Sequence, residues 1–119
     1  MANILIADDA KFMQTMVEKI LEKHGHNIVA FANNGKEAIK KYDKHRPDLV
    51  TMDITMPSVS GIEATEKILE IDPNANIIMC SAMGQKPMVL EAIEAGAKTF
   101  IVKPIKEDKL IESIEEVLS

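Results

Sequence analysis

The chain has 119 residues, of which 46% are hydrophobic, and this length and composition predict one domain spanning residues 1–119 with a sizeable core. Lysine and arginine number 14 against 19 acidic residues, so the net charge of -5 argues against a protein that binds nucleic acid through its phosphates. No apolar run approaches the ~18 residues of a membrane span, and the single cysteine, Cys80, lies in an apolar run, so we expect a cytoplasmic protein without an intrachain disulfide.

Short apolar runs alternate with helical patterns along the whole chain. The runs are bounded by turn-forming residues such as Gly25, Pro47 and Gly96, which is typical of strands, and between them apolar residues recur at spacings of three and four. The predicted elements in chain order are strand 3–7, helix 12–21, strand 27–31, helix 35–46, strand 48–53, helix 62–69, strand 76–81, helix 86–95, strand 98–102 and helix 110–118.

Strict alternation of strands and helices predicts an α/β fold. Strands that are apolar on both faces indicate a parallel sheet covered by helices on both faces. The simplest arrangement is a single flavodoxin-like (βα)5 domain whose five-stranded parallel sheet has the order 2-1-3-4-5. In that order the first and third strands are neighbours at the switch point, where ligands bind beyond the carboxyl ends of the strands.

Charged residues follow several of these strands at the point where each strand ends. Asp8 and Asp9 follow the first strand, Asp53 closes the third, Ser81 ends the fourth and Lys103 follows the fifth. Because the carboxyl ends of parallel strands meet at one edge of the sheet, we expect these side chains to lie together. Three carboxylates and an ammonium suit a divalent cation and a phosphoryl group.

These motifs together resemble the receiver domain of two-component response regulators. The resemblance rests on Asp8-Asp9, on Asp53 followed by Met56-Pro57 and Gly61, on Ser81-Ala82 and on Lys103-Pro104, and it covers the whole chain. Each motif alone is common, but all four at the correct strand ends and in the correct order are specific. Segments 52–57 and 92–98 resemble the stand-alone (CheY-like) chemotaxis regulators of bacteria and archaea.

The resemblance implies a phosphoacceptor and a magnesium site. Asp53 would accept the phosphoryl group as a mixed anhydride. Asp9 and Asp53 would bind Mg²⁺ directly, with Asp8 acting mainly through water and the backbone carbonyl of Thr55 as a further ligand. Outside such a family, an Asp-Asp pair after a strand is most often a helix cap.

Two further residues have implied roles at the phosphorylated site. Lys103 would pair with the phosphoryl oxygens, and the Ser81 hydroxyl would donate to another of them and so report the phosphate. Pro104 would orient the lysine through a cis peptide bond. Thr55 and Met83 flank the site at positions thought to tune dephosphorylation in the family.

The resemblance also implies a signalling protein and not an enzyme that acts on a separate substrate, since it would catalyse only its own Mg²⁺-dependent phosphorylation and dephosphorylation. We expect a monomer that takes phosphate from a histidine kinase, is reset by a phosphatase, and binds a flagellar or archaellar motor component or adaptor. Since no effector domain follows the last helix, the output is expected to be a changed surface. Its candidate residues are Lys86, Val89, Phe100 and Val102, and Phe100 replaces the tyrosine common in chemotaxis regulators.

Three alternatives to the motor switch remain open. A phosphorelay intermediate would pass its phosphate to a histidine phosphotransfer protein, and incubation with each partner type would distinguish phosphate transfer from complex formation. A haloacid dehalogenase type of enzyme would require a second aspartate at the position of Thr55 and generally a longer chain. A flavin carrier shares the predicted fold, but the acidic edge opposes a phosphate-bearing cofactor.

Overall fold

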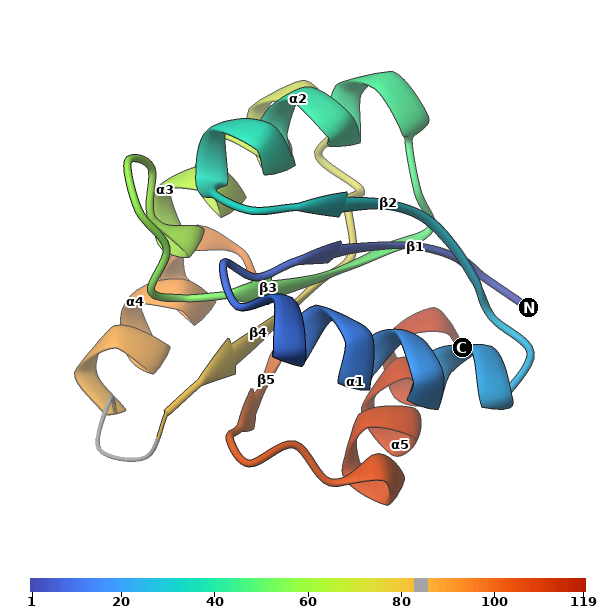
Figure 1. Cartoon of the computed structure of the whole chain (residues 1–119). Coiled ribbons are helices and arrows are strands. Elements are labelled where there is room, and N and C mark those ends of the chain that lie inside the picture. Colours follow the sequence, from blue (N-terminus) through green and yellow to red (C-terminus); the bar gives the residue numbers. More distant parts are fainter. Residues whose placement is uncertain (83–85) are drawn as a thin grey trace.

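The computed structural model describes residues 1–82 and 86–119. Strands and helices alternate along the described chain as the apolar pattern predicts (Figure 1). The elements are β1 (Asn3–Ala7), α1 (Lys11–Lys23), β2 (Asn27–Ala32), α2 (Gly35–His45), β3 (Leu49–Asp53), α3 (Gly61–Ile71), β4 (Ile77–Ser81), α4 (Lys86–Ala95), β5 (Thr99–Val102) and α5 (Glu107–Leu118).

The five strands form one parallel sheet in the order β2-β1-β3-β4-β5, which confirms the predicted flavodoxin-like arrangement. Strand boundaries agree with the prediction to within one residue. The second helix ends at His45, one residue before the predicted end, because Arg46 adopts a left-handed conformation with φ 44° and cannot continue the helix.

Strand residues alternate between two hydrophobic cores on opposite faces of the sheet. On β1, Leu5 and Ala7 pack beneath α2, α3 and α4, whereas Ile4 and Ile6 pack against α1 and α5. Figure 1 shows these two helix layers above and below the sheet. Because both sets of side chains are buried, the sequences of the central strands are continuous apolar runs and do not alternate between apolar and polar residues.

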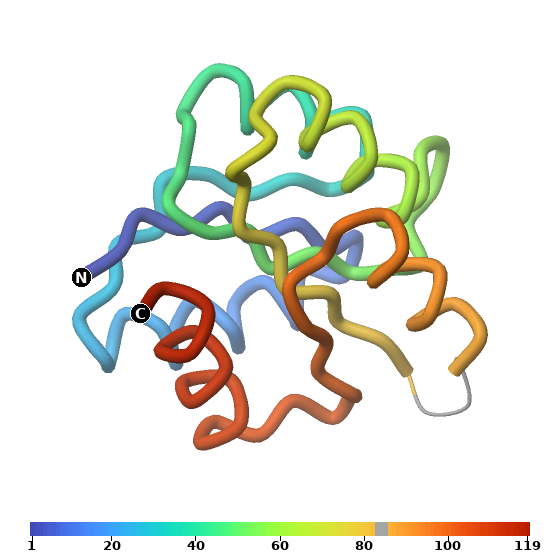
Figure 2. Tube along the Cα trace, turned by 180° about the vertical axis from the view of Figure 1, so that it is seen from behind, coloured from blue at the N-terminus to red at the C-terminus, as the bar shows by residue number. Residues whose placement is uncertain are grey.

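The two termini lie at the same end of the molecule in both views (Figures 1 and 2). The carboxyl ends of the strands lie at the opposite end, where the loops that follow β1, β3 and β5 are found. Among the described residues, no helix has both the length and the apolar character needed to cross a membrane.

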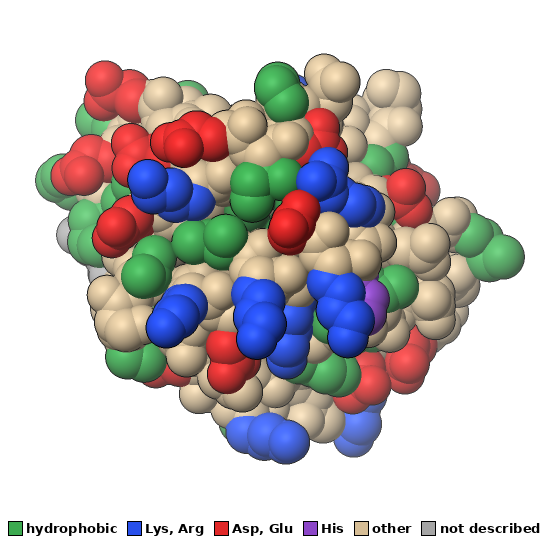
Figure 3. Space-filling model, turned by 90° about the horizontal axis from the view of Figure 1, so that it is seen from above, with side chains coloured by type: hydrophobic (Ala, Val, Ile, Leu, Met, Phe, Trp, Pro, Cys, Tyr) green, Lys and Arg blue, Asp and Glu red, His purple; other side chains and the backbone are tan. Residues whose placement is uncertain are grey.

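Charges of opposite sign are separated on the face seen from above α2. Figure 3 shows a row of lysine and arginine side chains across the middle of this face and a group of acidic side chains toward its upper left. Lys36, Lys40 and Lys44 are exposed on α2, and Glu63 and Glu66 are exposed on α3. The acidic protein therefore carries a row of exposed lysines along α2.

Side-chain caps determine where α2 and α3 begin. The Asn34 side chain accepts a hydrogen bond from the backbone N–H of Glu37, and the Ser60 side chain accepts one from Glu63. Each cap satisfies a backbone donor that has no partner inside its helix. These caps orient the first turns of both helices beside the carboxyl ends of β1 and β3.

Tyr42 joins α2 to the segment after α3. Its ring is 2% exposed, and its hydroxyl donates a 2.8 Å hydrogen bond to Asp72 Oδ2. Burial, followed by this bond to Asp72, raises the pKa of Tyr42. We expect Tyr42→Phe to lower the free energy of unfolding by about 1 kcal/mol, measured by urea denaturation, because the ring stays buried and only the hydrogen bond is lost. An unchanged unfolding midpoint would show that the bond does not contribute.

Candidate functional site

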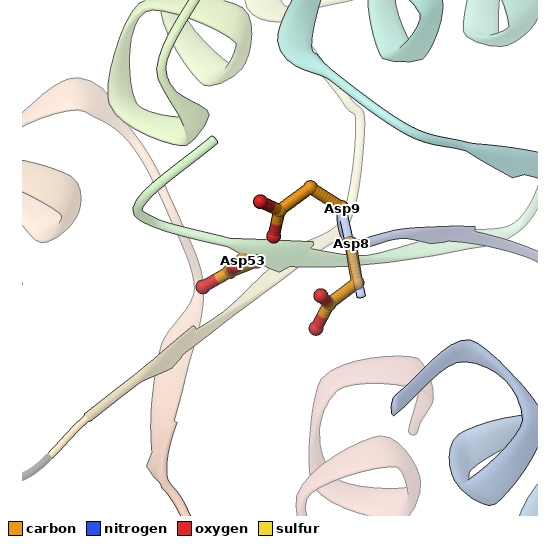
Figure 4. Close-up of side chains that lie close together, drawn as sticks. All are labelled: Asp8, Asp9 and Asp53. Atoms are coloured by element: carbon orange, nitrogen blue, oxygen red, sulfur yellow. The ribbon is translucent and has the colours of Figure 1, made fainter. Parts of the chain in front are cut away.

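The acidic residues after β1 and β3 meet at one edge of the sheet. Ala7 pairs with Met52 in the parallel ladder, so the residues that follow them leave neighbouring strands at the same level. One carboxylate oxygen each from Asp8, Asp9 and Asp53 lies within 4.8 Å of the others. Figure 4 shows the three side chains emerging from the adjacent ends of β1 and β3. The predicted cluster is therefore present.

Lys103 bridges two of these carboxylates from the loop after β5. Its Nζ lies 3.2 Å from Asp8 Oδ2 and 3.4 Å from Asp53 Oδ1. Its backbone N–H donates to the carbonyl of Ser81, which holds the loop after β5 against the end of β4. The peptide bond between Lys103 and Pro104 is cis, as the resemblance implied.

Burial of Asp53 changes the charge balance of the cluster. Burial raises the pKa of Asp53 to about 6, and the nearby Asp8 charge adds to this effect, whereas Lys103 opposes it. For Lys103, burial disfavours the ammonium, but Asp53 and Asp8 outweigh burial and raise its pKa. The Lys103 ammonium therefore outweighs the repulsion from Asp8 but does not offset the cost of burial, and added positive charge at this edge would stabilise the ionised form of Asp53.

The Ser81 hydroxyl is buried without a hydrogen-bond partner among the described residues. Ser81 is 1% exposed, and its Oγ has no hydrogen bond to any of the described residues. A buried hydroxyl without a partner costs free energy, so its presence here needs an explanation. Because Ser81 ends the strand next to Asp53, its hydroxyl is a donor placed for an oxygen-rich group at the same edge.

The donor set fits a hard divalent cation. Asp8 and Asp53 are buried and Asp9 is exposed, so the cluster is enclosed by protein on one side and accessible to water on the other. The Asp53 carboxylate also accepts a hydrogen bond from the backbone of Thr55, which comes close to the site in this way. Carboxylate oxygens, together with retained water, are the ligands that Mg²⁺ prefers.

The candidate output residues do not all lie at the surface. Phe100 is 43% exposed and Val102 42% exposed, and both line a groove of about 320 Å³ between β5 and α5. Lys86 is also exposed at the start of α4. The prediction for Val89 was wrong, because Val89 is 7% exposed and faces the core beneath α4.

Sequence reasoning missed three residues near these regions. Leu90 and Ile93 are the exposed apolar side chains of α4, at 57% and 41% exposure, and Gln14 is a polar residue buried on α1. The signal for Gln14 was its place at the same helical spacing as Val17 and Leu21, which share its buried face. Met83 lies outside the described residues.

Comparison with known proteins agrees with this fold. Residues 4–115 match the response regulator receiver domain, and the chain belongs to this family. It is 57% identical over 116 residues to the chemotaxis protein CheY of Bacillus subtilis, covering 98% of this chain and 97% of that protein. It is 54% identical over 114 residues to CheY of Thermotoga maritima, covering 96% and 95% of the two chains.

A solved structure shows the same fold with a similar sequence. The chain matches a CheX–CheY–BeF3–Mg²⁺ complex from Borrelia burgdorferi with a TM-score of 0.93 and 41% identity, covering 98% of this chain and 89% of that one. The chain is therefore a CheY-like chemotaxis receiver domain, which is a two-component signalling protein and not a classical enzyme.

Proposed function

We propose that residues 1–119 act as one cytoplasmic, phosphorylation-activated chemotaxis switch that accepts phosphate from a histidine kinase on Asp53. A phosphatase resets the switch, and its active form binds a flagellar or archaellar motor component or adaptor. The observation that carries this proposal is a buried Asp53 between the Lys103 ammonium and two further carboxylates, beside a Ser81 hydroxyl that has no partner in residues 1–82 and 86–119.

The residues at the edge suit each part of a phosphoryl transfer. A carboxylate oxygen of Asp53 attacks phosphorus, and the bond from phosphorus to the donor imidazole nitrogen breaks, with its electron pair leaving on the imidazole. The Lys103 ammonium then moves from the Asp53 carboxylate to the phosphoryl oxygens. The Ser81 hydroxyl donates to another of these oxygens and so gains a partner that no described residue provides.

Magnesium would supply positive charge that offsets the phosphoryl oxygens during transfer. Asp9 and Asp53 would hold it directly, Asp8 mainly through water, and the backbone carbonyl of Thr55 would add a ligand. The presence of BeF3, Mg²⁺ and CheX in the Borrelia burgdorferi complex supports a metal, a phosphoryl-like group and a protein partner for a relative of this chain.

The direct test is to locate the phosphorylated residue. The protein is incubated with acetyl phosphate with and without Mg²⁺, the acyl phosphate is reduced with borohydride, and the modified peptide is identified by mass spectrometry. We expect modification at Asp53 only, and only with Mg²⁺. Label on another residue, or none with Mg²⁺ present, would contradict the proposal.

Removal of Asp9 tests the role of the metal. We expect Asp9→Ala to reduce Mg²⁺-dependent labelling by about 100-fold or more, because a ligand charge is lost while the nucleophile remains. Labelling is followed with acetyl phosphate over a Mg²⁺ titration. Asp43→Ala, which removes an exposed carboxylate of α2, is the control and should label normally. Wild-type labelling of Asp9→Ala would rule out the metal role.

The output face offers a separate prediction. In the proposed switch the Ser81 hydroxyl moves toward the phosphoryl oxygen and vacates space for the half-exposed ring of Phe100. Fluorine NMR on fluorophenylalanine-labelled protein should show a shifted Phe100 resonance when beryllium fluoride and Mg²⁺ are added. Phe12 and Phe31 serve as internal controls. An unchanged Phe100 resonance would exclude this ring as the reporter.

A further inference from the structure

Gln14 is a buried polar residue that contacts two loops at once. It lies on α1 and is 4% exposed. Its Nε2 donates to the backbone carbonyl of Asp8 at 2.6 Å, to Asn33 Oδ1 at 2.9 Å and, more weakly, to the carbonyl of Ala32 at 3.4 Å. A single amide group thus links the loop after β1 with the loop after β2.

The link continues to the first turn of α2. The backbone N–H of Asp8 donates to the Ala32 carbonyl at 3.0 Å, which ties the same two loops a second time. The backbone N–H and the side-chain amide of Asn33 both donate to Glu37 Oε1, at 2.9 and 3.2 Å. The carbonyl of Asp8 is therefore held by a chain of bonds that ends on a helix.

The carbonyl of Asp8 belongs to the peptide that joins Asp8 to Asp9. A peptide unit is planar, so the position of this oxygen also determines the orientation of the Asp9 N–H and of both Cα atoms. The two carboxylates are held differently: Asp8 bonds to Lys103 and to the N–H of Ala10, whereas no described residue donates to the exposed Asp9 carboxylate. The direction in which the Asp9 side chain points therefore depends on the orientation of its backbone.

We propose that Gln14 is a positioning residue that orients the Asp8–Asp9 peptide and so sets the affinity of the acidic cluster for a divalent cation. The inference rests on the proposed function, because it takes Asp9 as a metal ligand. It assigns the orientation of Asp9 to a residue of α1 that lies outside the cluster. Asp9 is the member of the cluster whose carboxylate has no partner among the described residues. A purely structural role for Gln14 would lower stability and leave cation affinity unchanged.

The test compares Mg²⁺ affinity in variants of the full chain. Gln14→Met keeps an unbranched side chain and removes the donor. We expect its Mg²⁺ dissociation constant to rise about 10-fold, the lower end of what loss of an indirect contact to a metal site costs. The constant is measured without phosphodonor, from the amide shifts of Asp9 and Ala10 in an NMR titration.

Two further variants keep the result interpretable. Tyr42→Phe also removes one partly buried hydrogen bond, but near the C-terminal end of α2, and its Mg²⁺ affinity should stay within about twofold of wild type. Asn33→Ala removes the side-chain oxygen that accepts a hydrogen bond from Gln14, and it should raise the Mg²⁺ dissociation constant about threefold. If Gln14→Met does not fold, this variant tests the role of Gln14 in its place.

Wild-type affinity in the folded variants would overturn the role of Gln14. Failure of the proposed function has a different signature, because wild-type protein itself would then show no Mg²⁺-dependent shifts at Asp9. An equal loss of affinity in Tyr42→Phe would also overturn the proposal, since the effect would then follow from lost stability in general.

Discussion

Asp53→Asn is expected to abolish phosphoryl labelling completely and, at the same time, to make the metal-free protein more stable at neutral pH. Labelling is lost because an amide does not form the acyl phosphate that a carboxylate oxygen forms. Stability rises because the amide that replaces the carboxylate has no charge to bury. Labelling is expected to fall while stability rises, so lost labelling in this variant cannot be attributed to damage to the fold.

The stability effect depends on pH in a defined direction. The pKa of Asp53 is about 6 in the folded protein, raised by burial from an ordinary value of 3.8. Between these values the folded protein retains a proton that the unfolded chain has lost. The contribution of Asp53 to the free energy of unfolding is therefore fully present below the ordinary pKa. It declines as pH rises through about 6, by up to about 3 kcal/mol.

Urea unfolding in chelator at several pH values measures this slope. Wild-type protein should lose stability between about pH 4 and pH 7 relative to Asp53→Asn, with the two curves converging at the acidic end. Asp43→Asn, which changes an exposed carboxylate paired with Arg46, should retain the wild-type slope. Parallel curves for wild type and Asp53→Asn would show that Asp53 ionises normally in the folded protein.

Gly61→Ala is expected to be strongly destabilising. A Cβ on Gly61 would lie 2.1 Å from the backbone oxygen of Asp53 and 2.9 Å from Cα of Ile54. Both are backbone atoms, so relief requires movement of the end of β3. We expect a loss of about 3 kcal/mol or more in the free energy of unfolding, measured by urea denaturation.

Gly25→Ala provides the comparison. Gly25 has φ +86°, but the nearest atom to an added Cβ is 3.8 Å away, so the cost is only that of a left-handed alanine, about 1 kcal/mol. Equal losses in the two variants would show that the end of β3 adapts to the Cβ. In Gly61→Ala we also expect slower labelling of Asp53, because the crowded oxygen belongs to that residue.

Most of the fold could be predicted because local pattern and global arrangement agree. Apolar residues at successive positions such as Ile4 and Leu5 indicate strands buried on both faces, and the caps Asn34 and Ser60 match the helix starts. Surface exposure on α4 was harder to predict. Val89 and Leu90 are both apolar and adjacent, and only the packing against β4 and β5 decides that Val89 is buried and Leu90 exposed.

The strand pattern was enough to place Asp8, Asp9, Asp53, Ser81 and Lys103 at one edge, because parallel strands bring their carboxyl ends together whatever their separation along the chain. How these groups act on one another could be seen only in the folded protein. The raised pKa of Asp53 depends on exclusion of water by several segments, and the burial of the Ser81 hydroxyl without a partner in the described part of the chain depends on what surrounds it. The contact of Gln14 with the Asp8 carbonyl likewise needs α1 packed against two loops. Solvation and hydrogen bonding are set by atoms brought together from distant segments, and the residue types alone do not specify these distances.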